Sequence, residues 1–336
     1  DVFMESGSRY FDTAYTYLGG KSEEAIRRCV AERKPRNSFR LADKLPGYKC
    51  QSHADCRKYF DEQLARCGVE WFDVYMLHWL NAANYAVAEE MDEFGFLREL
   101  KAEGLAKKIG FSYHDSAELL DTILTRHPEI DYVQLQINYL DWESASIQAR
   151  LCYETAARHG KKVVVMEPVK GGMLAKVPEN IGALLQKAEP RLSPAAQALC
   201  FAQNLPQVEV VLSGMNTVEQ VAENLSVPTD ITEPHRAALL QAAELLRASI
   251  TVACTGCGYC VSHCPKHIAI PKYFALYNDL MRTPDESWKI QPVYDSIARK
   301  NGKASDCIAC RSCERNCPQK LSISEYLKAA AAALEG

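Results

Sequence analysis

The stretch Cys254-Thr255-Gly256-Cys257-Gly258-Tyr259-Cys260-Val261-Ser262-His263-Cys264-Pro265 places four cysteines at short, regular intervals and closes on a proline. The same spacing, CxxCxxCxxxCP, returns further along the chain in Cys307, Cys310, Cys313 and Cys317, followed by Pro318. Eight of the 14 cysteines therefore belong to two copies of one pattern. Because thiolates are preferred ligands of soft metal centres, the repeat predicts two metal-binding loops within one small domain.

The pattern resembles the run with which bacterial ferredoxins hold a 4Fe-4S cluster, where the fourth cysteine of each run binds the other cluster. That resemblance implies two crossed ligand sets: Cys254, Cys257, Cys260 and Cys317 for one cluster, and Cys307, Cys310, Cys313 and Cys264 for the other. Zinc is the nearest alternative, although it usually takes two CxxC pairs. Disulfides fit less well, because thiols this close along a loop are poor partners and no secretory signal is visible. The clusters could also have only a structural role, in which metal binding supplies folding free energy to a small domain.

The composition suits a large buried core with a small appended domain, at 336 residues and 47% hydrophobic content. A net charge of -4, with both signs spread along the chain, predicts neither nucleic acid nor an anionic membrane as a partner. No apolar run approaches the roughly twenty residues of a membrane span. The remaining cysteines lack ligand spacing and predict ordinary thiols in a reducing, cytoplasmic setting: Cys29, Cys50, Cys56, Cys67, Cys152 and Cys200.

Upstream of the cysteine runs, short apolar stretches alternate with longer helical patterns. The expected strands are residues 8–12, 39–44, 72–78, 107–111, 132–136, 162–166 and 208–212. The expected helices between them are residues 22–32, 54–67, 91–103, 116–126, 144–158 and 195–204. This alternation predicts an α/β fold, a (β/α)8 TIM barrel of parallel strands. Because one strand of eight is missing, we expect the first strand to precede Asp1, with residues 2–6 in a helix that ends at Gly7.

Polar residues stand where three of these strands end: Asp12, Lys44 and His78, with Tyr17 shortly after the first. The carboxyl ends of barrel strands converge on one mouth, so we expect the four side chains to meet there. Together they would form a proton donor for a carbonyl oxygen. The Lys44 cation would stabilise the tyrosinate left by Tyr17, Asp12 would hold Lys44, and His78 would orient the substrate oxygen. Taken singly, each residue also has a structural interpretation, as a helix cap, a surface lysine or a buried imidazole.

These residues, in this order and context, resemble the aldo-keto reductases. The likeness rests on Phe11-Asp12-Thr13-Ala14-Tyr15-Thr16-Tyr17, on Lys44 at the end of the next strand, and on Asp73-Val74-Tyr75-Met76-Leu77-His78-Trp79. The resemblance covers nearly everything before about residue 225. It implies that the catalytic tetrad of that family is present as Asp12, Tyr17, Lys44 and His78.

The resemblance also implies a nicotinamide cofactor. In Ile109-Gly110-Phe111-Ser112 and Val133-Gln134-Leu135-Gln136, the family places Ser112 and Gln134 near the nicotinamide carboxamide. Met166 replaces the aromatic residue that covers the ring in many members, and its polarizable sulfur can do the same. The loop and helix over residues 212–224 imply four further contacts: Gly214, Asn216, Gln220 and Asn224. Because this loop lacks the lysine and arginine that grip a 2'-phosphate in some branches, both NADPH and NADH fit, with a modest preference for NADPH.

The prolines of residues 227–234 predict a linker that follows the barrel. We therefore expect a barrel domain over residues 1–226, a linker and helix over 227–250, and a ferredoxin-like domain over 251–336. Helical patterns occupy residues 234–248, 271–282, 291–300 and 322–334. The long insert between the cysteine runs resembles the mostly helical two-cluster domains that feed electrons to larger oxidoreductases.

The combined features predict an NAD(P)H-linked oxidoreductase that interconverts a small carbonyl compound and an alcohol, coupled to electron transfer through two 4Fe-4S clusters. A hydride carries two electrons and each cluster accepts one, so a flavin or a redox partner protein would have to split the pair. The alternative is an electron-transfer or docking subunit whose barrel is a non-catalytic scaffold. Candidate walls of the substrate pocket are Tyr48, Trp79, Tyr85 and Tyr139.

Overall fold

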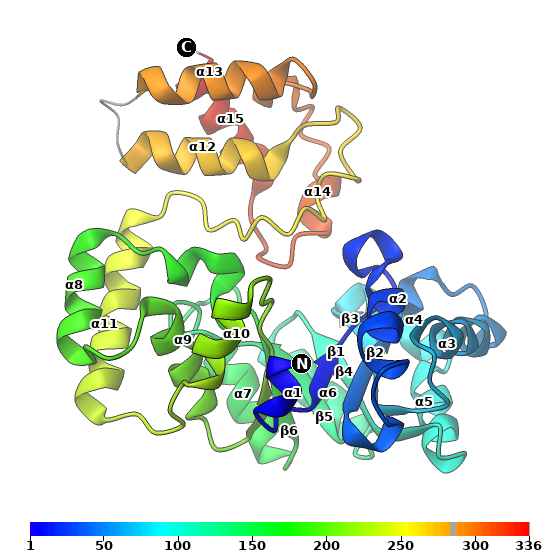
Figure 1. Cartoon of the computed structure of the whole chain (residues 1–336). Helices are drawn as coiled ribbons and strands as arrows, with labels where there is room; N and C mark the ends of the chain where they lie inside the picture. The colour runs from blue at the N-terminus through cyan, green and yellow to red at the C-terminus, as the bar shows by residue number, and fades with distance from the viewer. Residues whose placement is uncertain (283–286, 336) are drawn as a thin grey trace. The chain divides into compact units, whose positions relative to one another are not determined.

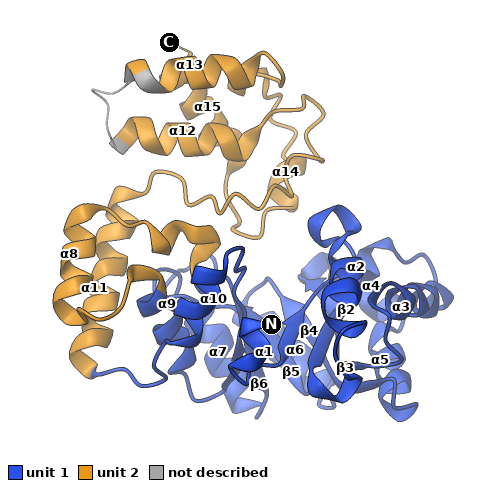
Figure 2. Ribbon diagram, in the orientation of Figure 1, with its two compact units in different colours: residues 1–168, 196–232 blue, residues 169–195, 233–336 orange. Residues whose placement is uncertain are grey.

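The computed structural model describes residues 1–282 and 287–335 and divides into two compact units (Figure 1). Unit 1 comprises residues 1–168 and 196–232, and unit 2 comprises residues 169–195 together with the chain from residue 233 onward, as Figure 2 shows by colour. Segment 169–195, which follows the sixth strand, thus makes most of its contacts within unit 2. No helix of the described residues has the length and apolar character that a membrane crossing requires.

Seven parallel strands form one sheet in chain order. They are β1 (Tyr10–Asp12), β2 (Arg40–Leu45), β3 (Phe72–Leu80), β4 (Ala106–Tyr113), β5 (Tyr132–Gln136), β6 (Lys162–Met166) and β7 (Val208–Val211). The expected strands agree with these bounds to within two residues. Parallel neighbours joined by helical crossovers confirm the predicted α/β barrel class.

The sheet curls almost into a closed barrel. One buried cluster draws on strands from across the whole sheet, and its members are Ala42, Val74, Met76, Tyr132 and Val164, with Tyr10, Val210 and Leu212 packed against it. Tyr10 lies in β1 and Val210 in β7, the two edge strands. A flat sheet would keep its edges far apart, so a cluster shared by both edges means that the strands surround a common interior.

The helices of unit 1 lie between the strands: α1 (Val2–Glu5), α2 (Ser22–Ile26), α3 (His53–Cys67), α4 (Ala82–Glu90), α5 (Glu93–Ala102), α6 (Ala117–Arg126), α7 (Ala149–Arg158), α9 (Pro194–Gln203, whose first residues belong to unit 2) and α10 (Val218–Leu225). The expected helix 144–158 was wrong at its start, because residues 139–147 form turns and Gln148 has a left-handed φ of 55°. Helix α4 was not expected. Its N-cap is Asn81, whose side chain accepts a hydrogen bond from the main-chain N–H of Asn84 at 2.9 Å.

Unit 2 is helical, as the sequence predicts for its C-terminal part. Its helices are α8 (Glu179–Ala188), α11 (Glu233–Ser249), α12 (Ile270–Arg282), α13 (Ser287–Ala298), α14 (Ser312–Arg315) and α15 (Ile323–Leu334). Helices α12 and α15 contribute Tyr273, Phe274 and Leu327 to an apolar core that also contains Cys260 and Cys313. Two of the motif cysteines are therefore part of the core packing.

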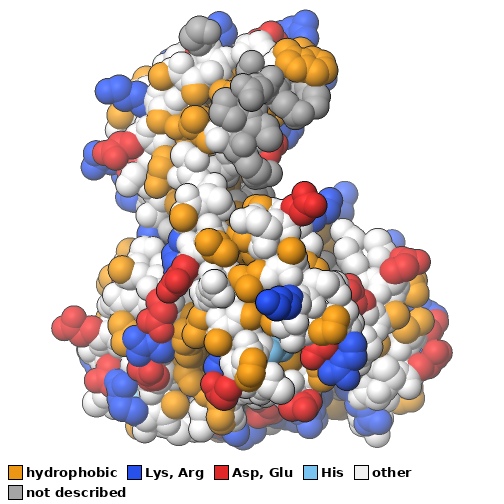
Figure 3. Space-filling model, turned by 90° about the vertical axis from the view of Figure 1, so that its left-hand side faces the viewer, with side chains coloured by type: hydrophobic (Ala, Val, Ile, Leu, Met, Phe, Trp, Pro, Cys, Tyr) orange, Lys and Arg blue, Asp and Glu red, His pale blue; other side chains and the backbone are white. Residues whose placement is uncertain are grey.

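Charged side chains of both signs are interspersed on the face of the molecule shown in Figure 3. This agrees with the small net charge of -4.

Candidate active site and cluster loops

The four residues predicted to be catalytic come from three neighbouring strands and one loop. Asp12 is the last residue of β1, Lys44 lies near the end of β2, and His78 lies in β3. Lys44 is paired with Met76 in the register of β2 and β3, two residues before His78 on the neighbouring strand. Tyr17 opens the short 3-10 turn Tyr17–Gly20 that follows β1. The carboxyl ends of the strands thus deliver all four side chains to one mouth of the barrel.

Lys44 is the centre of this group. Its ammonium donates to Asp12 Oδ2 at 2.6 Å and to the carbonyl oxygen of Thr13 at 2.8 Å. The same nitrogen lies 5.0 Å from the centre of the Tyr17 ring. The Tyr17 and His78 ring centres are 5.7 Å apart and meet edge to face. The structure therefore brings the predicted tetrad together.

The surroundings of these groups set their protonation. Lys44 is fully buried. Burial opposes its charge, but the Asp12 carboxylate and the Tyr17 phenol raise the pKa of Lys44 above its ordinary value. Burial raises the pKa of Tyr17, and the Lys44 cation counteracts part of that rise, so the phenol is protonated at neutral pH. Burial, reinforced by the Lys44 charge, lowers the pKa of His78 well below its ordinary value, which leaves the imidazole neutral.

A buried polar network anchors the end of β2 beneath Lys44. The Gln63 amide nitrogen lies 2.8 Å from Asp43 Oδ1 and 3.0 Å from Glu23 Oε1. The Tyr75 hydroxyl donates to the Gln63 amide oxygen at 2.6 Å. Asp43 Oδ1 also accepts from the main-chain N–H of Lys44 at 2.8 Å. Because these groups are buried and bonded to one another, they fix the strand that carries the lysine.

Backbone strain marks the position directly after His78. Trp79 has a left-handed φ of 64°, which is unfavourable for a bulky residue. Its N–H donates to the Ser112 hydroxyl on the neighbouring strand β4 at 2.7 Å, which helps to hold that conformation. The buried Nδ1 of His78 has no hydrogen-bond partner among the residues that the structure describes. The imidazole is thus held in position while this nitrogen remains free to bond a further group.

The residues expected near a nicotinamide ring lie side by side on β4, β5 and β6. Ser112 is paired with Gln134, and Gln136 is paired with Met166. The Gln134 amide nitrogen is 3.5 Å from the Met166 sulfur, while its buried amide oxygen has no partner in the described part of the chain. Ser112 accepts the Trp79 hydrogen bond and keeps its own proton to donate. A carboxamide would satisfy both groups, so these residues fit the predicted cofactor.

The predicted phosphate loop precedes α10 and is braced from that helix. Gln220 accepts from the main-chain N–H of Asn216 at 2.9 Å, and Asn224 donates to the Ser213 hydroxyl at 2.9 Å. Gly214 and Asn216 are exposed on the loop itself. The two helix side chains thus shape the loop, while the N-terminal end of α10 offers main-chain donors of the kind that bind phosphate.

The four aromatic residues expected around a substrate do not lie together. The Tyr48 ring centre lies 6.1 Å from that of His78 and 6.0 Å from that of Trp79, so Tyr48 and Trp79 flank the tetrad. Tyr85 instead packs against Phe94, and Tyr139 is fully buried. The sequence does not separate these two environments, because it does not show which aromatic side chains near the strand ends turn toward the barrel mouth and which pack into the core.

The motif cysteines of unit 2 group as the crossed ligand sets require. One small cavity has Cys254, Cys257, Cys260 and Cys317 in its wall, so the last cysteine of the second run meets the first three of the first run. Burial, with the nearby thiols Cys257, Cys254 and Cys317, raises the pKa of Cys260 to about 12.

For the second ligand set the structure gives an electrostatic interaction between Cys264 and Cys313, and Cys313 also acts on Cys260 of the first run. Burial raises the pKa of Cys313 to about 11, and Glu314, Cys307 and Cys264 contribute in the same direction. Cys264, the last cysteine of the first run, is therefore close enough to act on the second loop. Cys257 and Cys310 are exposed.

The spacing of these sulfur atoms suits clusters better than single zinc ions. Around one tetrahedral zinc, with zinc–sulfur bonds of about 2.3 Å, the sulfurs lie about 3.8 Å apart. In the described residues, the one group of three or more such ligand atoms that all lie within 4.8 Å of one another is Cys50, Cys56 and Glu93, not a set of motif cysteines. In a 4Fe-4S cluster each thiolate binds a different iron, which separates the sulfurs further. The motif cysteines therefore fit the predicted clusters.

Comparison with known proteins assigns both parts of the chain. Residues 1–233 match the model of the aldo/keto reductase family, and residues 253–322 match that of the 4Fe-4S dicluster domain. An aldo-keto reductase of Mycobacterium avium (strain 104) is 28% identical over 232 residues, which cover 69% of this chain and 75% of that protein. The NADH-specific methylglyoxal reductase of Escherichia coli (strain K12) is 26% identical over 274 residues, which cover 67% of this chain and 81% of that protein.

Solved structures share the barrel fold. The holo form of an aldo-keto reductase from Bacillus halodurans superposes with a TM-score of 0.60 at 22% identity, covering 72% of this chain and 85% of the other. An aldo-keto reductase from Klebsiella pneumoniae in complex with NADPH gives a TM-score of 0.58 at 18% identity, with coverages of 73% and 82%.

Proposed function

Because the chain belongs to the aldo/keto reductase family and also carries a 4Fe-4S dicluster domain, we propose that it is an NAD(P)H-linked carbonyl reductase coupled to single-electron transfer. The observation that supports the reductase assignment is the position of the Lys44 ammonium, 2.6 Å from Asp12 and 5.0 Å from the centre of the Tyr17 ring.

In this proposal Tyr17 gives its proton to the carbonyl oxygen of the substrate. Lys44 stabilises the negative charge that remains on the phenol oxygen, and Asp12 keeps the lysine charged and in place. His78, neutral at physiological pH, hydrogen-bonds the substrate oxygen and sets its orientation. In the reverse direction Tyr17 accepts the proton of an alcohol. Tyr48 and Trp79 flank His78 and would contact the substrate.

The nicotinamide cofactor, when bound, supplies the hydride for the carbonyl carbon. Ser112 and Gln134 would hold its carboxamide, Met166 would cover one face of the ring, and the loop before α10 would bind the phosphates. The curated relative from E. coli is named for NADH, and the Klebsiella structure contains NADPH. In this chain the phosphate loop has neutral side chains at Asn216, Gln220 and Asn224. Because no lysine or arginine there would grip a 2'-phosphate, any preference for NADPH over NADH would be modest.

The dicluster domain would hold one cluster on Cys254, Cys257, Cys260 and Cys317 and a second on Cys307, Cys310, Cys313 and Cys264. Clusters of this kind move one electron at a time. Since Cys257 and Cys310 are exposed, both loops are accessible to a redox partner protein. A flavin, on this chain or on that partner, would connect single-electron transfer to hydride transfer.

The experiment uses anaerobically purified protein with a measured content of iron, sulfide, nicotinamide and flavin. About eight irons and eight sulfides per chain are expected from two filled sites. Oxidation of NADPH is then followed with a panel of small aldehydes and ketones. Tyr17→Phe should abolish turnover, whereas Tyr15→Phe, which removes a phenol bonded to Glu62 at 3.1 Å, should leave it nearly unchanged.

A second candidate function is an electron-transfer or docking subunit with a non-catalytic barrel. The exposed cysteines of both cluster loops favour it, because they suit electron exchange with a partner. This function predicts filled, redox-active clusters and no NADPH oxidation with any member of the panel. Turnover that Tyr17→Phe abolishes would contradict it.

A further inference from the structure

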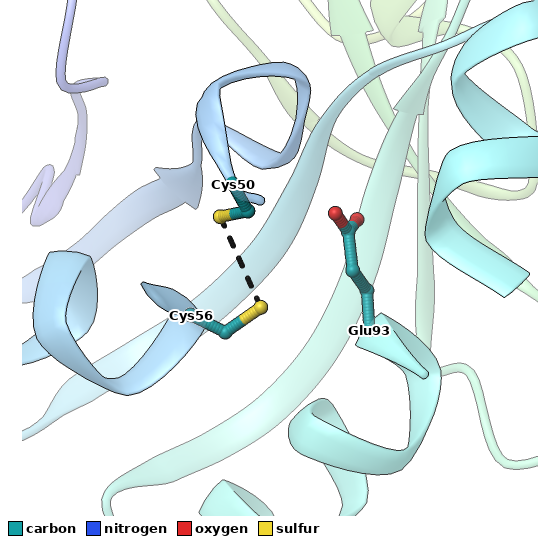
Figure 4. Close-up of side chains that lie close together, drawn as sticks. All are labelled: Cys50, Cys56 and Glu93. Carbon is teal, nitrogen blue, oxygen red and sulfur yellow. Dashed lines mark hydrogen bonds between the residues drawn. The ribbon is translucent and has the colours of Figure 1, made fainter. Parts of the chain in front are cut away.

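A third group of metal-binding side chains lies in unit 1, outside both the tetrad and the cluster loops. Cys50 follows the 3-10 turn Gly47–Lys49 after β2, Cys56 lies in α3, and Glu93 is the first residue of α5. Cys50 is 8% exposed, Cys56 is fully buried and Glu93 is 3% exposed. Figure 4 shows the two sulfur atoms facing each other and the carboxylate directed toward the same space.

The distances suit one metal ion. The two sulfur atoms are 3.9 Å apart, and all three ligand atoms lie within 4.8 Å of one another. Two thiolates bound to a tetrahedral zinc ion with bonds of about 2.3 Å are separated by about 3.8 Å. Both cysteines are free thiols in the structure. The group is therefore close to the geometry of a thiolate-rich zinc site.

The carboxyl group of Glu93 gives a second observation, separate from the sulfur distances, that points to a bound cation. Its buried Oε1 has no hydrogen-bond partner among the described residues, although an unpaired buried carboxyl oxygen is costly. A Cβ atom on Gly47 would collide with this carboxylate, so the carboxylate packs directly against the main chain at Gly47. Burial raises the pKa of Glu93 to about 7. The carboxyl group is thus held against the cysteine-bearing segment without a partner for its charge.

We propose that Cys50, Cys56 and Glu93 bind a divalent cation of the zinc class. Two thiolates and a carboxylate match the borderline-soft character of zinc, and three protein ligands are the number found where zinc keeps a fourth position for water. Binding releases the two thiol protons to solvent, together with the Glu93 proton where that carboxyl is protonated. A disulfide between the cysteines would use both sulfurs but would leave the buried carboxylate unpaired. The metal accounts for all three groups.

The site would fix one wall of the candidate substrate pocket. It joins the segment after β2 to α3 and α5, three elements that no disulfide connects in the described structure. Tyr48 lies two residues before Cys50, and its ring faces His78 and Trp79. A metal bound at Cys50 would therefore restrain an aromatic side chain that flanks the tetrad. The inference does not depend on the proposed reductase activity.

The test uses the full-length holoprotein with both clusters filled, purified anaerobically and exposed to a slight excess of zinc sulfate. After desalting, elemental analysis should find about one zinc per chain in addition to the cluster iron. Zinc-edge X-ray absorption should show two sulfur neighbours at about 2.3 Å and oxygen neighbours at about 2.0 Å. This signal is specific for zinc and is not obscured by the clusters.

Two variants and one control locate the ion. Cys56→Ser and Glu93→Gln should each weaken zinc binding at least tenfold, and the glutamine variant keeps both thiols in case the serine variant folds poorly. Cys29→Ser, which changes an exposed cysteine elsewhere in unit 1, should retain the zinc. The proposal is overturned if the wild-type protein binds no zinc, if both variants retain it, or if mass analysis finds Cys50 and Cys56 joined as a disulfide in anaerobic protein.

Discussion

Replacing Lys44 with methionine tests the charge at the centre of the candidate site. The ammonium lies 5.0 Å from the centre of the Tyr17 ring and is fully buried. With an effective dielectric constant of about 20, a unit charge at that distance stabilises a phenolate by about 3 kcal/mol. That energy corresponds to roughly two orders of magnitude in rate. We therefore expect Lys44→Met to lower kcat for aldehyde reduction about 100-fold.

The pH dependence of the reverse reaction gives a second, more specific readout. Alcohol oxidation requires the deprotonated form of Tyr17, and the Lys44 cation lowers the pKa of that phenol against the effect of burial. Without the cation, the pH at which oxidation reaches half its maximum should rise by about two units. The assay is NADP+ reduction at 340 nm across the pH range. Lys49→Met, a change of an exposed lysine in the following loop, is the matched control and should leave the profile in place.

The same substitution destabilises the barrel, so the two effects must be separated. Removing Lys44 leaves Asp12 buried without its 2.6 Å partner, which typically costs about 3–5 kcal/mol. The double variant Asp12→Asn, Lys44→Met removes both charges and should recover most of that stability without recovering activity. The reasoning is refuted if Lys44→Met retains kcat within about fivefold of wild type, or if the double variant is active.

Three further predictions concern other buried groups. Burial and Lys44 lower the pKa of His78, so its contribution to stability is present above the unfolded pKa of about 6.5 and is lost as the pH falls below it. Relative to His78→Gln, wild type should therefore lose about 1.4 kcal/mol per pH unit below 6.5, measured by denaturant unfolding at pH 7.5 and 5.5. Gln63→Leu removes a shared hydrogen-bond partner from two buried carboxyl groups and should destabilise the barrel by about 2–4 kcal/mol in the same assay. Lys170, buried in unit 2, donates at 2.8 Å to Gln319 in the wall of the first cluster cavity, so Lys170→Met should lower the midpoint potential of that cluster by tens of millivolts. An EPR-monitored redox titration measures this shift, and no shift, or an equal shift in the exposed-residue control Lys176→Met, would contradict it.

The strands were predictable because each leaves a local signal. β3, for example, is an apolar run interrupted by Asp73 and His78, both only partly buried, and it ends close to where that pattern stops. The tetrad followed from one further rule, that carboxyl ends of parallel strands share a mouth. Asp12, Lys44 and His78 could therefore be placed together before their distances were known. The roles assigned to them remain predictions.

Other features depend on contacts that the sequence does not encode locally. Helix α4 has a weak amphipathic pattern, with Tyr85 and Ala88 as its buried residues, so only the Asn81 cap marks its start. The helix expected from residue 144 fails because Gln148 turns left-handed and accepts a hydrogen bond from the Ala117 N–H at 2.9 Å, a partner on another element. Such a contact appears only once α6 and α7 have packed.

The group of Cys50, Cys56 and Glu93 shows the same limit for a candidate site. Cys50 and Cys56 are separated by five residues and have no CxxC spacing, so the sequence suggests ordinary thiols. Glu93 lies on a different helix, and its carboxylate reaches the cysteines because α3 and α5 pack beside β2 and β3. A ligand set built from three elements is a property of the tertiary fold. The motif cysteines, by contrast, carry their spacing within each loop.

The barrel and the dicluster domain differ in their functional residues: the barrel mouth carries groups that can donate a proton, and the cluster loops carry thiols. In the barrel mouth, burial keeps the Tyr17 phenol protonated and the His78 imidazole neutral beside the charged Lys44, which are the protonation states that the proposed carbonyl reduction needs. The cluster loops instead combine the motif thiols with the apolar core of unit 2. Two clusters accept two electrons in total, which equals the content of one hydride. Under the proposed coupling, two filled clusters would therefore hold the two electrons of one hydride, and a converter would only have to change a paired transfer into two single-electron transfers.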